Sequence, residues 1–176
     1  MTLLRPDASE FHHFYAGYVA VVPDGDIRTI LAQQRSECVA RWRQIPESEA
    51  ATIHAPYQWK LRQVLDHLTD GERIFGYRLF RIARGDQTPL PGYDESFYAA
   101  ASERHPAPLA DIIESFECLR QANLNLVRNL SDSVWNCTGT ANNSHITVRA
   151  LTYILAGHVF HHDVILRKRL GLVVPD

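Results

Sequence analysis

Three histidines lie within five positions of the sequence GHVFHHDVIL, residues 157–166, which otherwise has the composition of a buried helix. With about 100° between successive residues of a helix, His158 and His162 are about 40° apart and fall inside the apolar stripe. His161 is about 80° from His162, at the edge of that stripe. The spacing therefore predicts that His158 and His162 point inward together.

Two imidazoles in an apolar stripe need hydrogen-bond partners or a metal ion, because burying an unpaired polar group costs about 1–3 kcal/mol. Histidines at i and i+4 commonly present two nitrogens to one ion, and a third ligand would leave one position open, as in catalytic zinc sites. His67, in VLDHLTDGER, is the candidate third ligand. We predict one divalent metal ion, zinc or nickel, on His67, His158 and His162, because imidazole suits both metals. The alternatives remain satisfied core histidines for the pair and a surface position for His67.

Three carboxylates flank the third histidine: Asp66, Asp70 and Glu72. One of them could accept a hydrogen bond from a metal-binding imidazole. We expect instead a solvated helix face, with Glu72 paired to Arg73 or Arg78. We expect Tyr57, Trp59 and the aromatics of YDESFY to pack in the core and crossover rather than to line a pocket. The motifs Glu-x-x-His and His-Glu-x-x-His are absent, so no built-in general base accompanies the histidine pair.

The histidines must be positioned by helices, because apolar residues recur with a spacing near 3.6 and no sustained strand-type alternation is present. Four long helices are predicted, the first from Asp24 or Asp26 to Pro46, the second from Trp59 to Gly85, the third from Pro108 to Leu130, and the fourth from Thr147 to Gly171. Residues 85–107 form a long link, in which ESFYAAASE could be a short helix. Since parallel neighbours need such a link, we predict an all-α four-helix bundle with one long crossover between its second and third helices, in one domain over residues 1–176.

The composition argues against several partners. The 176 residues carry a formal net charge of -2, without the basic excess of nucleic-acid-binding proteins. Three cysteines are too few for a disulfide framework, which suggests a reducing compartment. The N-terminal sequence lacks a secretory signal, and its longest apolar run is too short to span a bilayer. We therefore expect a cytoplasmic protein with no nucleic-acid or membrane partner.

Several segments together resemble a known family: FYAGYVAVVPDGDI, VLDHL, DGERIFGYR, PLPGYDESFY, FECLRQANLNLVRNLS and GHVFHH. They resemble the DinB-like superfamily of bacterial metal-binding four-helix bundles, which includes bacillithiol-type thiol transferases and proteins described as metal-dependent hydrolases. The resemblance implies His67, His158 and His162 as ligands, and a homodimer. Asp163 stands where some relatives carry an arginine.

The resemblance and the three histidines together imply a metal-dependent thiol S-transferase or hydrolase acting on a small molecule, such as a low-molecular-weight thiol. A three-histidine ion can lower the pKa of bound water toward about 7 or hold a thiol as thiolate. Since protonated imidazole cannot bind a metal, affinity is expected to fall below a pH of about 6.5. The alternative is a non-catalytic metal-binding bundle that acts as a binding or stress-response module.

Overall fold

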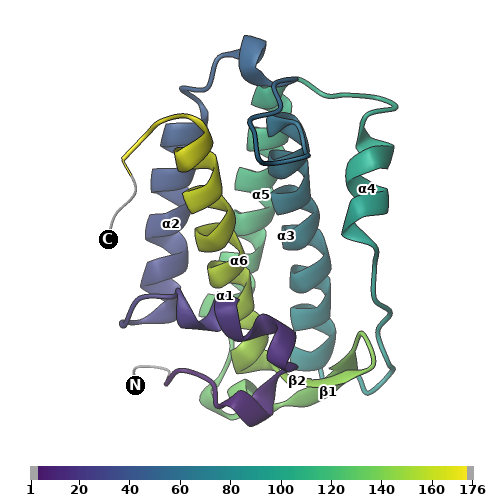
Figure 1. The fold of residues 1–176 in the computed structure, drawn as a ribbon. Coiled ribbons are helices and arrows are strands. Elements are labelled where there is room, and N and C mark those ends of the chain that lie inside the picture. Colours follow the sequence, from purple (N-terminus) through teal and green to yellow (C-terminus); the bar gives the residue numbers. More distant parts are fainter. Residues whose placement is uncertain (1–3, 174–176) are drawn as a thin grey trace.

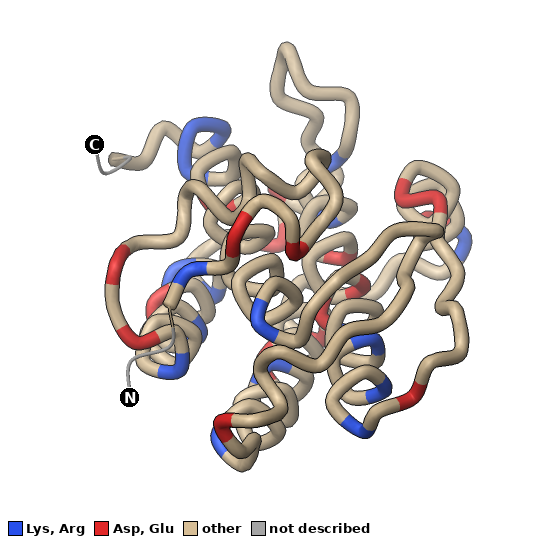
Figure 2. Tube along the Cα trace, turned by 90° about the horizontal axis from the view of Figure 1, so that it is seen from below, with Lys and Arg blue, Asp and Glu red and all other residues tan. Residues whose placement is uncertain are grey.

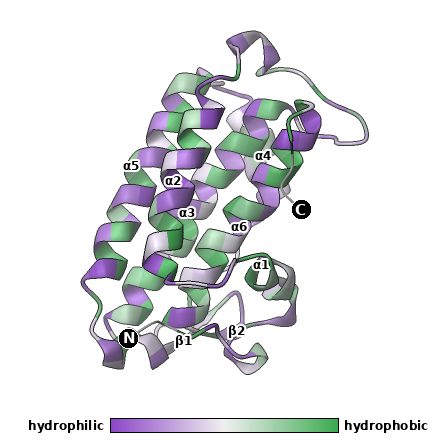
Figure 3. Ribbon diagram, turned by 90° about the vertical axis from the view of Figure 1, so that its left-hand side faces the viewer, coloured by the Kyte–Doolittle hydropathy of each residue, from purple (hydrophilic) through white to green (hydrophobic). Residues whose placement is uncertain are grey.

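The computed structural model describes residues 4–173, so the first and last three residues of the predicted domain lie outside it. Its long helices are α2 (Ile27–Trp42), α3 (Leu61–Ala83), α5 (Leu109–Arg128) and α6 (Val148–Arg169). They pack as the predicted all-α four-helix bundle, with α3 against both α5 and α6 (Figure 1). Each long helix alternates hydrophilic and hydrophobic bands, as expected of helices with one face in the core (Figure 3).

The predicted helix starts agree with the capping contacts. The Asp26 carboxylate accepts hydrogen bonds from the backbone N–H groups of Arg28 and Thr29, so Asp26 rather than Asp24 caps α2. The Thr147 hydroxyl accepts from the N–H of Ala150 at the start of α6, and α5 begins directly after Pro108. These side chains satisfy backbone donors that a helix leaves unpaired in its first turn.

The link between α3 and α5 is the predicted crossover, and it contains a short helix, α4 (Glu95–Ser102). This helix lies along the outside of α3 (Figure 1). The Gln63 amide on α3 donates to the Ala99 carbonyl at 2.7 Å, and Lys60 forms an ion pair with Glu103. The crossover therefore covers a face of α3 that the sequence pattern leaves open to solvent.

The all-α chain contains one short β-hairpin that the sequence pattern did not predict. Strands β1 (Thr138–Ala141) and β2 (Ser144–Thr147) form an antiparallel hairpin. Its turn residues Asn142 and Asn143 have φ of 50° and 58°, a region that asparagine tolerates and that two-residue hairpin turns require. Leu90 of the crossover exchanges backbone hydrogen bonds of 2.9 Å with Thr140 and Asn142. The hairpin tip is thus fixed to the crossover.

The segment before α2 contains short helices that the sequence did not predict, among them α1 (Ala16–Ala20). Helix α1 crosses α6 at Gly157, where a Cβ atom added to the glycine would lie 1.9 Å from the Tyr18 carbonyl oxygen. Only glycine therefore permits this crossing. The close approach brings the Tyr18 ring over the part of α6 that carries the histidines.

The core has two apolar clusters separated by a layer of polar residues. Each of the four long helices contributes residues to one cluster at the hairpin end of the bundle and to the other cluster at the opposite end. The buried polar residues between them include Gln34 on α2, Glu72 on α3, Arg120 on α5 and His158 on α6. On the surface, basic and acidic residues are interspersed, and the hairpin carries neither (Figure 2). None of the helices within residues 4–173 is both long and apolar enough to cross a bilayer.

Candidate metal centre

The three predicted histidines lie together. His67 on α3 and His158 and His162 on α6 each offer a ring nitrogen, and these three atoms all lie within 4.8 Å of one another. The Nε2 atoms of His67 and His158 are 2.9 Å apart. His161 is exposed, and its ring packs edge-on against the Tyr18 ring. The helical spacing thus selected the inward-facing pair.

Gly71 makes room for the histidine cluster, a name used from here for His67, His158 and His162. A Cβ atom at Gly71 would lie 2.7 Å from Cε1 and 2.8 Å from Nδ1 of His158. The His158 ring is therefore packed directly against the backbone of α3. Any larger residue at this position would displace the ring from its neighbours.

Burial keeps the histidine cluster neutral. Desolvation lowers the pKa of His67 to about 4, although the nearby Glu95 carboxylate opposes the shift, and lowers the pKa of His162 to about 3. Burial also lowers the pKa of His158 well below its usual value, and His162 and His67 add to this effect. Neutral rings retain a lone pair for a metal ion, so protons compete with the metal only at pH values well below 6.5. The expected loss of affinity near pH 6.5 therefore shifts to lower pH.

The hydrogen bonds of the cluster are incomplete. Nε2 of His162 is buried and has no hydrogen-bond partner among the described residues. Such an orphaned atom is costly unless a ligand binds it. Imidazole nitrogens suit divalent zinc and nickel, so the donor set fits an ion of this class. The alternative interpretation of satisfied core histidines does not account for His162.

None of the neighbouring carboxylates is hydrogen-bonded to the histidine cluster within residues 4–173. Glu72 is buried, and Arg120 donates to both of its oxygens, at 2.5 and 3.0 Å. The expected pairing of Glu72 on a solvated face is therefore wrong. Asp70 does pair with Arg73, at 3.1 Å near the surface.

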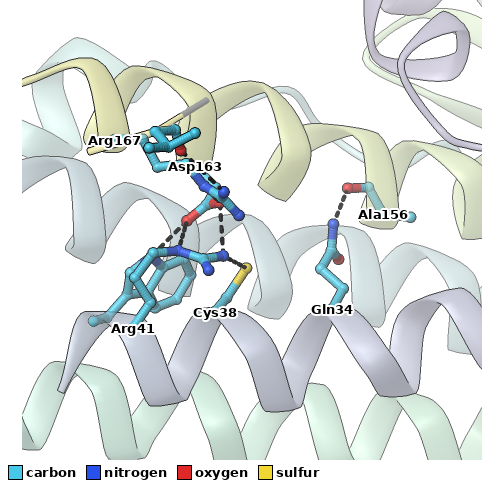
Figure 4. A network of polar contacts seen from close by, with 8 residues as sticks. Gln34, Cys38, Arg41, Ala156, Asp163 and Arg167 are labelled. Atoms are coloured by element: carbon cyan, nitrogen blue, oxygen red, sulfur yellow. Dashed lines mark hydrogen bonds and ion pairs between the residues drawn. The ribbon is translucent and has the colours of Figure 1, made fainter. Parts of the chain in front are cut away.

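Asp163 is also directed away from the histidine cluster. Its carboxylate accepts hydrogen bonds from Arg41 and Trp42 of α2, both at 2.9 Å, and from Arg167 at 2.8 Å. Figure 4 shows Asp163 between α6 and α2, with Gln34 bonded to the Ala156 carbonyl further along. Asp163 thus joins α6 to α2.

A cavity of about 530 Å³ opens onto the histidine cluster. Aromatic side chains form much of its wall: Phe14, Tyr15, Tyr18, Trp59, Phe75 and Tyr93. The expectation that the aromatics stay outside a pocket is therefore wrong for Trp59 and Tyr93, whereas Phe97 and Tyr98 are not among the lining residues. The polar residues Arg78, Glu95, Asn142 and Ser144 also line the cavity. Sequence reasoning missed them because the crossover and hairpin that supply most of them have no helical periodicity.

A family model described as the DinB superfamily matches residues 30–166. The chain belongs to the DinB superfamily. This confirms the resemblance in the sequence. A search of curated proteins found no match.

Two solved structures show the same DinB fold. YfiT from Bacillus subtilis, described as a probable metal-dependent hydrolase with an unusual four-helix bundle topology, has a TM-score of 0.71 at 20% identity, over 86% of this chain and 91% of that one. A mycothiol-dependent maleylpyruvate isomerase has a TM-score of 0.66 at 14% identity, over 84% of this chain and 60% of that one. At these identities the likeness shows a shared fold.

Proposed function

We propose that this DinB-superfamily protein binds one divalent ion, zinc or nickel, through His67, His158 and His162, and acts on a small molecule by thiol transfer or hydrolysis. The orphaned, buried Nε2 of His162, beside the ring nitrogens of the other two, carries the proposal. The fold-related YfiT is described as a probable metal-dependent hydrolase and the fold-related isomerase as mycothiol-dependent, which supports this class of chemistry.

The chain supplies the surroundings that such chemistry needs. When bound, the ion would act as a Lewis acid toward a water molecule or hold a thiol as its thiolate. The rings of Trp59, Tyr18 and Phe75 pack edge-on against the histidine cluster and limit the access of bulk water. The Glu95 carboxylate lines the same cavity, which makes it the candidate group to accept a proton from a substrate.

A turnover screen with matched variants tests the proposal. Zinc- or nickel-loaded protein is incubated with low-molecular-weight thiols and chlorodinitrobenzene, and separately with small esters and amides. We expect wild type to turn over one of these two substrate classes. His162→Ala should lose this activity, and His161→Ala should retain it. If the protein binds the metal and turns over neither class, the non-catalytic binding module is the correct interpretation.

We further propose a homodimer, on the basis of the family resemblance. Light scattering should then give twice the 20.0 kDa of one chain. A mass near 20.0 kDa would contradict the dimer. The cytoplasmic location and the absence of a nucleic-acid partner stay predictions.

A further inference from the structure

Arg78 is a buried cation without a counter-ion. It is 3% exposed, lies in the wall of the cavity, and donates from Nη2 to the Pro91 carbonyl at 2.7 Å. No carboxylate lies within ion-pair distance of it among residues 4–173, whereas the equally buried Arg120 has Glu72. A guanidinium has five N–H donors, so most of those of Arg78 remain available. Burying an unpaired charge is costly, which favours a ligand that supplies the missing negative charge.

Arg78 and the histidine cluster line the same cavity at a distance from each other. Arg78 is eleven residues beyond His67 on α3, which corresponds to a rise of about 16 Å along the helix axis. The guanidinium lies closer to the histidine cluster than this rise, because long side chains lean toward the helix N-terminus. The Phe75 ring lies between them, 5.9 Å from the Arg78 guanidinium carbon and 5.5 Å from the His158 ring. A molecule extended along Phe75 can therefore contact both.

The surroundings of Arg78 contain neutral donors. Tyr93, Asn142 and Ser144 line the cavity with it, and burial raises the pKa of Tyr93, whose hydroxyl thus keeps its proton. The Asn142 side chain packs against Gly92, where an added Cβ atom would lie 2.2 Å from Asn142 Oδ1. Glu95 is the one carboxylate among the lining residues, and it forms no ion pair with Arg78. One positive charge and neutral donors match a single negative charge better than a phosphate dianion.

We propose that Arg78 binds the carboxylate of a substrate whose other end reaches the histidine cluster. The substrate class is thus a small, extended molecule with a carboxylate at one end. A guanidinium holds a carboxylate through two parallel N–H···O bonds, which fixes both position and direction. Only the binding of the substrate's other end at the histidine cluster rests on the proposed metal function.

The first test requires no metal. Metal-free protein is titrated with sodium hexanoate and, separately, with hexanol, while NMR follows the Arg78 side-chain N–H signal. We expect a saturable shift with hexanoate and none with hexanol. Equal responses to the two compounds, or none, would overturn the carboxylate site.

The second test joins both ends of the substrate. Cobalt(II)-loaded protein is titrated with mercaptohexanoate, mercaptohexanol and thioglycolate, and thiolate binding is read from the sulfur-to-cobalt absorption band. We expect the acid to bind about tenfold or more tightly than the alcohol, since charge-assisted pairs are strong. Arg78→Gln should reduce this ratio to about one, and Arg78→Lys should retain part of it. Arg84→Gln removes an exposed charge from the end of the same helix and should retain all of it.

The two tests separate the two hypotheses. A hexanoate shift without a thiolate band would leave the carboxylate site in place and contradict thiol binding at the metal. A thiolate band with the same acid-to-alcohol ratio in wild type and Arg78→Gln would overturn the Arg78 proposal alone. Thioglycolate is too short to reach both ends, so its affinity should not change in Arg78→Gln.

Discussion

Two groups of buried polar residues lie side by side in this bundle and differ in their hydrogen bonding. In the arginine cluster (Gln34, Glu72, Arg120 and Asn123), Arg120 donates to Glu72, to Gln34 and to the Leu155 carbonyl, while Gln34 and Asn123 also donate their amide N–H groups. In the histidine cluster, by contrast, Nε2 of His162 has no partner within residues 4–173. The difference fits a stabilising role for the first group and supports the proposal that the second binds a ligand.

The arginine cluster also supports the histidine cluster. Glu72 follows Gly71, against which the His158 ring packs, and the Arg120 charge contributes to the lowered pKa of His158. The polar layer thus consists of the arginine cluster, which is hydrogen-bonded in the bundle interior, and the histidine cluster, which opens to the cavity.

The largest expected effect on stability follows from breaking the arginine cluster. Arg120→Met leaves the Glu72 carboxylate buried without a counter-ion, which should lower the free energy of unfolding by about 3–5 kcal/mol. Urea denaturation measures the loss. Adding Glu72→Leu removes the stranded charge and should recover most of the stability, so an equal loss in the single and double variants would contradict this account.

The next effect is a pH dependence of the metal-free protein. Unfolded histidines bind protons near pH 6.5, whereas folded His67 and His162 do so only near pH 4 and pH 3. The unfolded state therefore binds more protons as the pH falls through 6.5, and stability decreases with a slope that approaches about 1.4 kcal/mol per pH unit for each histidine as the unfolded histidine becomes fully protonated. Denaturation curves between pH 7 and pH 5 should show this slope. His162→Leu should reduce it, and an unchanged slope in that variant would argue against the assignment.

The smallest effect on stability is expected in the histidine cluster. Because Nε2 of His162 has no partner to lose, His162→Leu should change the free energy of unfolding of the metal-free protein by less than about 1 kcal/mol at pH 8. Calorimetry at that pH provides the measurement. A loss as large as that of Arg120→Met would mean that the histidines, too, are structural.

The sequence predicted the parts of the structure that depend on periodicity. The apolar spacing gave the four helices, and the angle between His158 and His162 gave the inward pair. His67 was placed from its position in the second helix and from the family resemblance. The hairpin was missed because four-residue strands are too short for a clear alternation, although the pair Asn142–Asn143 is a turn signal.

The charged residues of α3 were misjudged for a different reason. Charged side chains are usually exposed, so Glu72 and Arg78 were assigned to a solvated face. Their actual environments come from distant parts of the chain. Glu72 meets Arg120 of α5, and Arg78 meets Pro91 of the crossover. A helical wheel contains no information on which segment covers which face, so neither contact could be predicted.

The metal content of purified protein tests the central claim most directly. Wild type and four alanine variants, at His67, His158, His161 and His162, are loaded with zinc or nickel, desalted and analysed by elemental mass spectrometry. We predict about one ion per chain for wild type and His161→Ala, and a large loss of bound metal for the other three. Full occupancy in His67→Ala, His158→Ala and His162→Ala would contradict the account, as would a loss confined to His161→Ala.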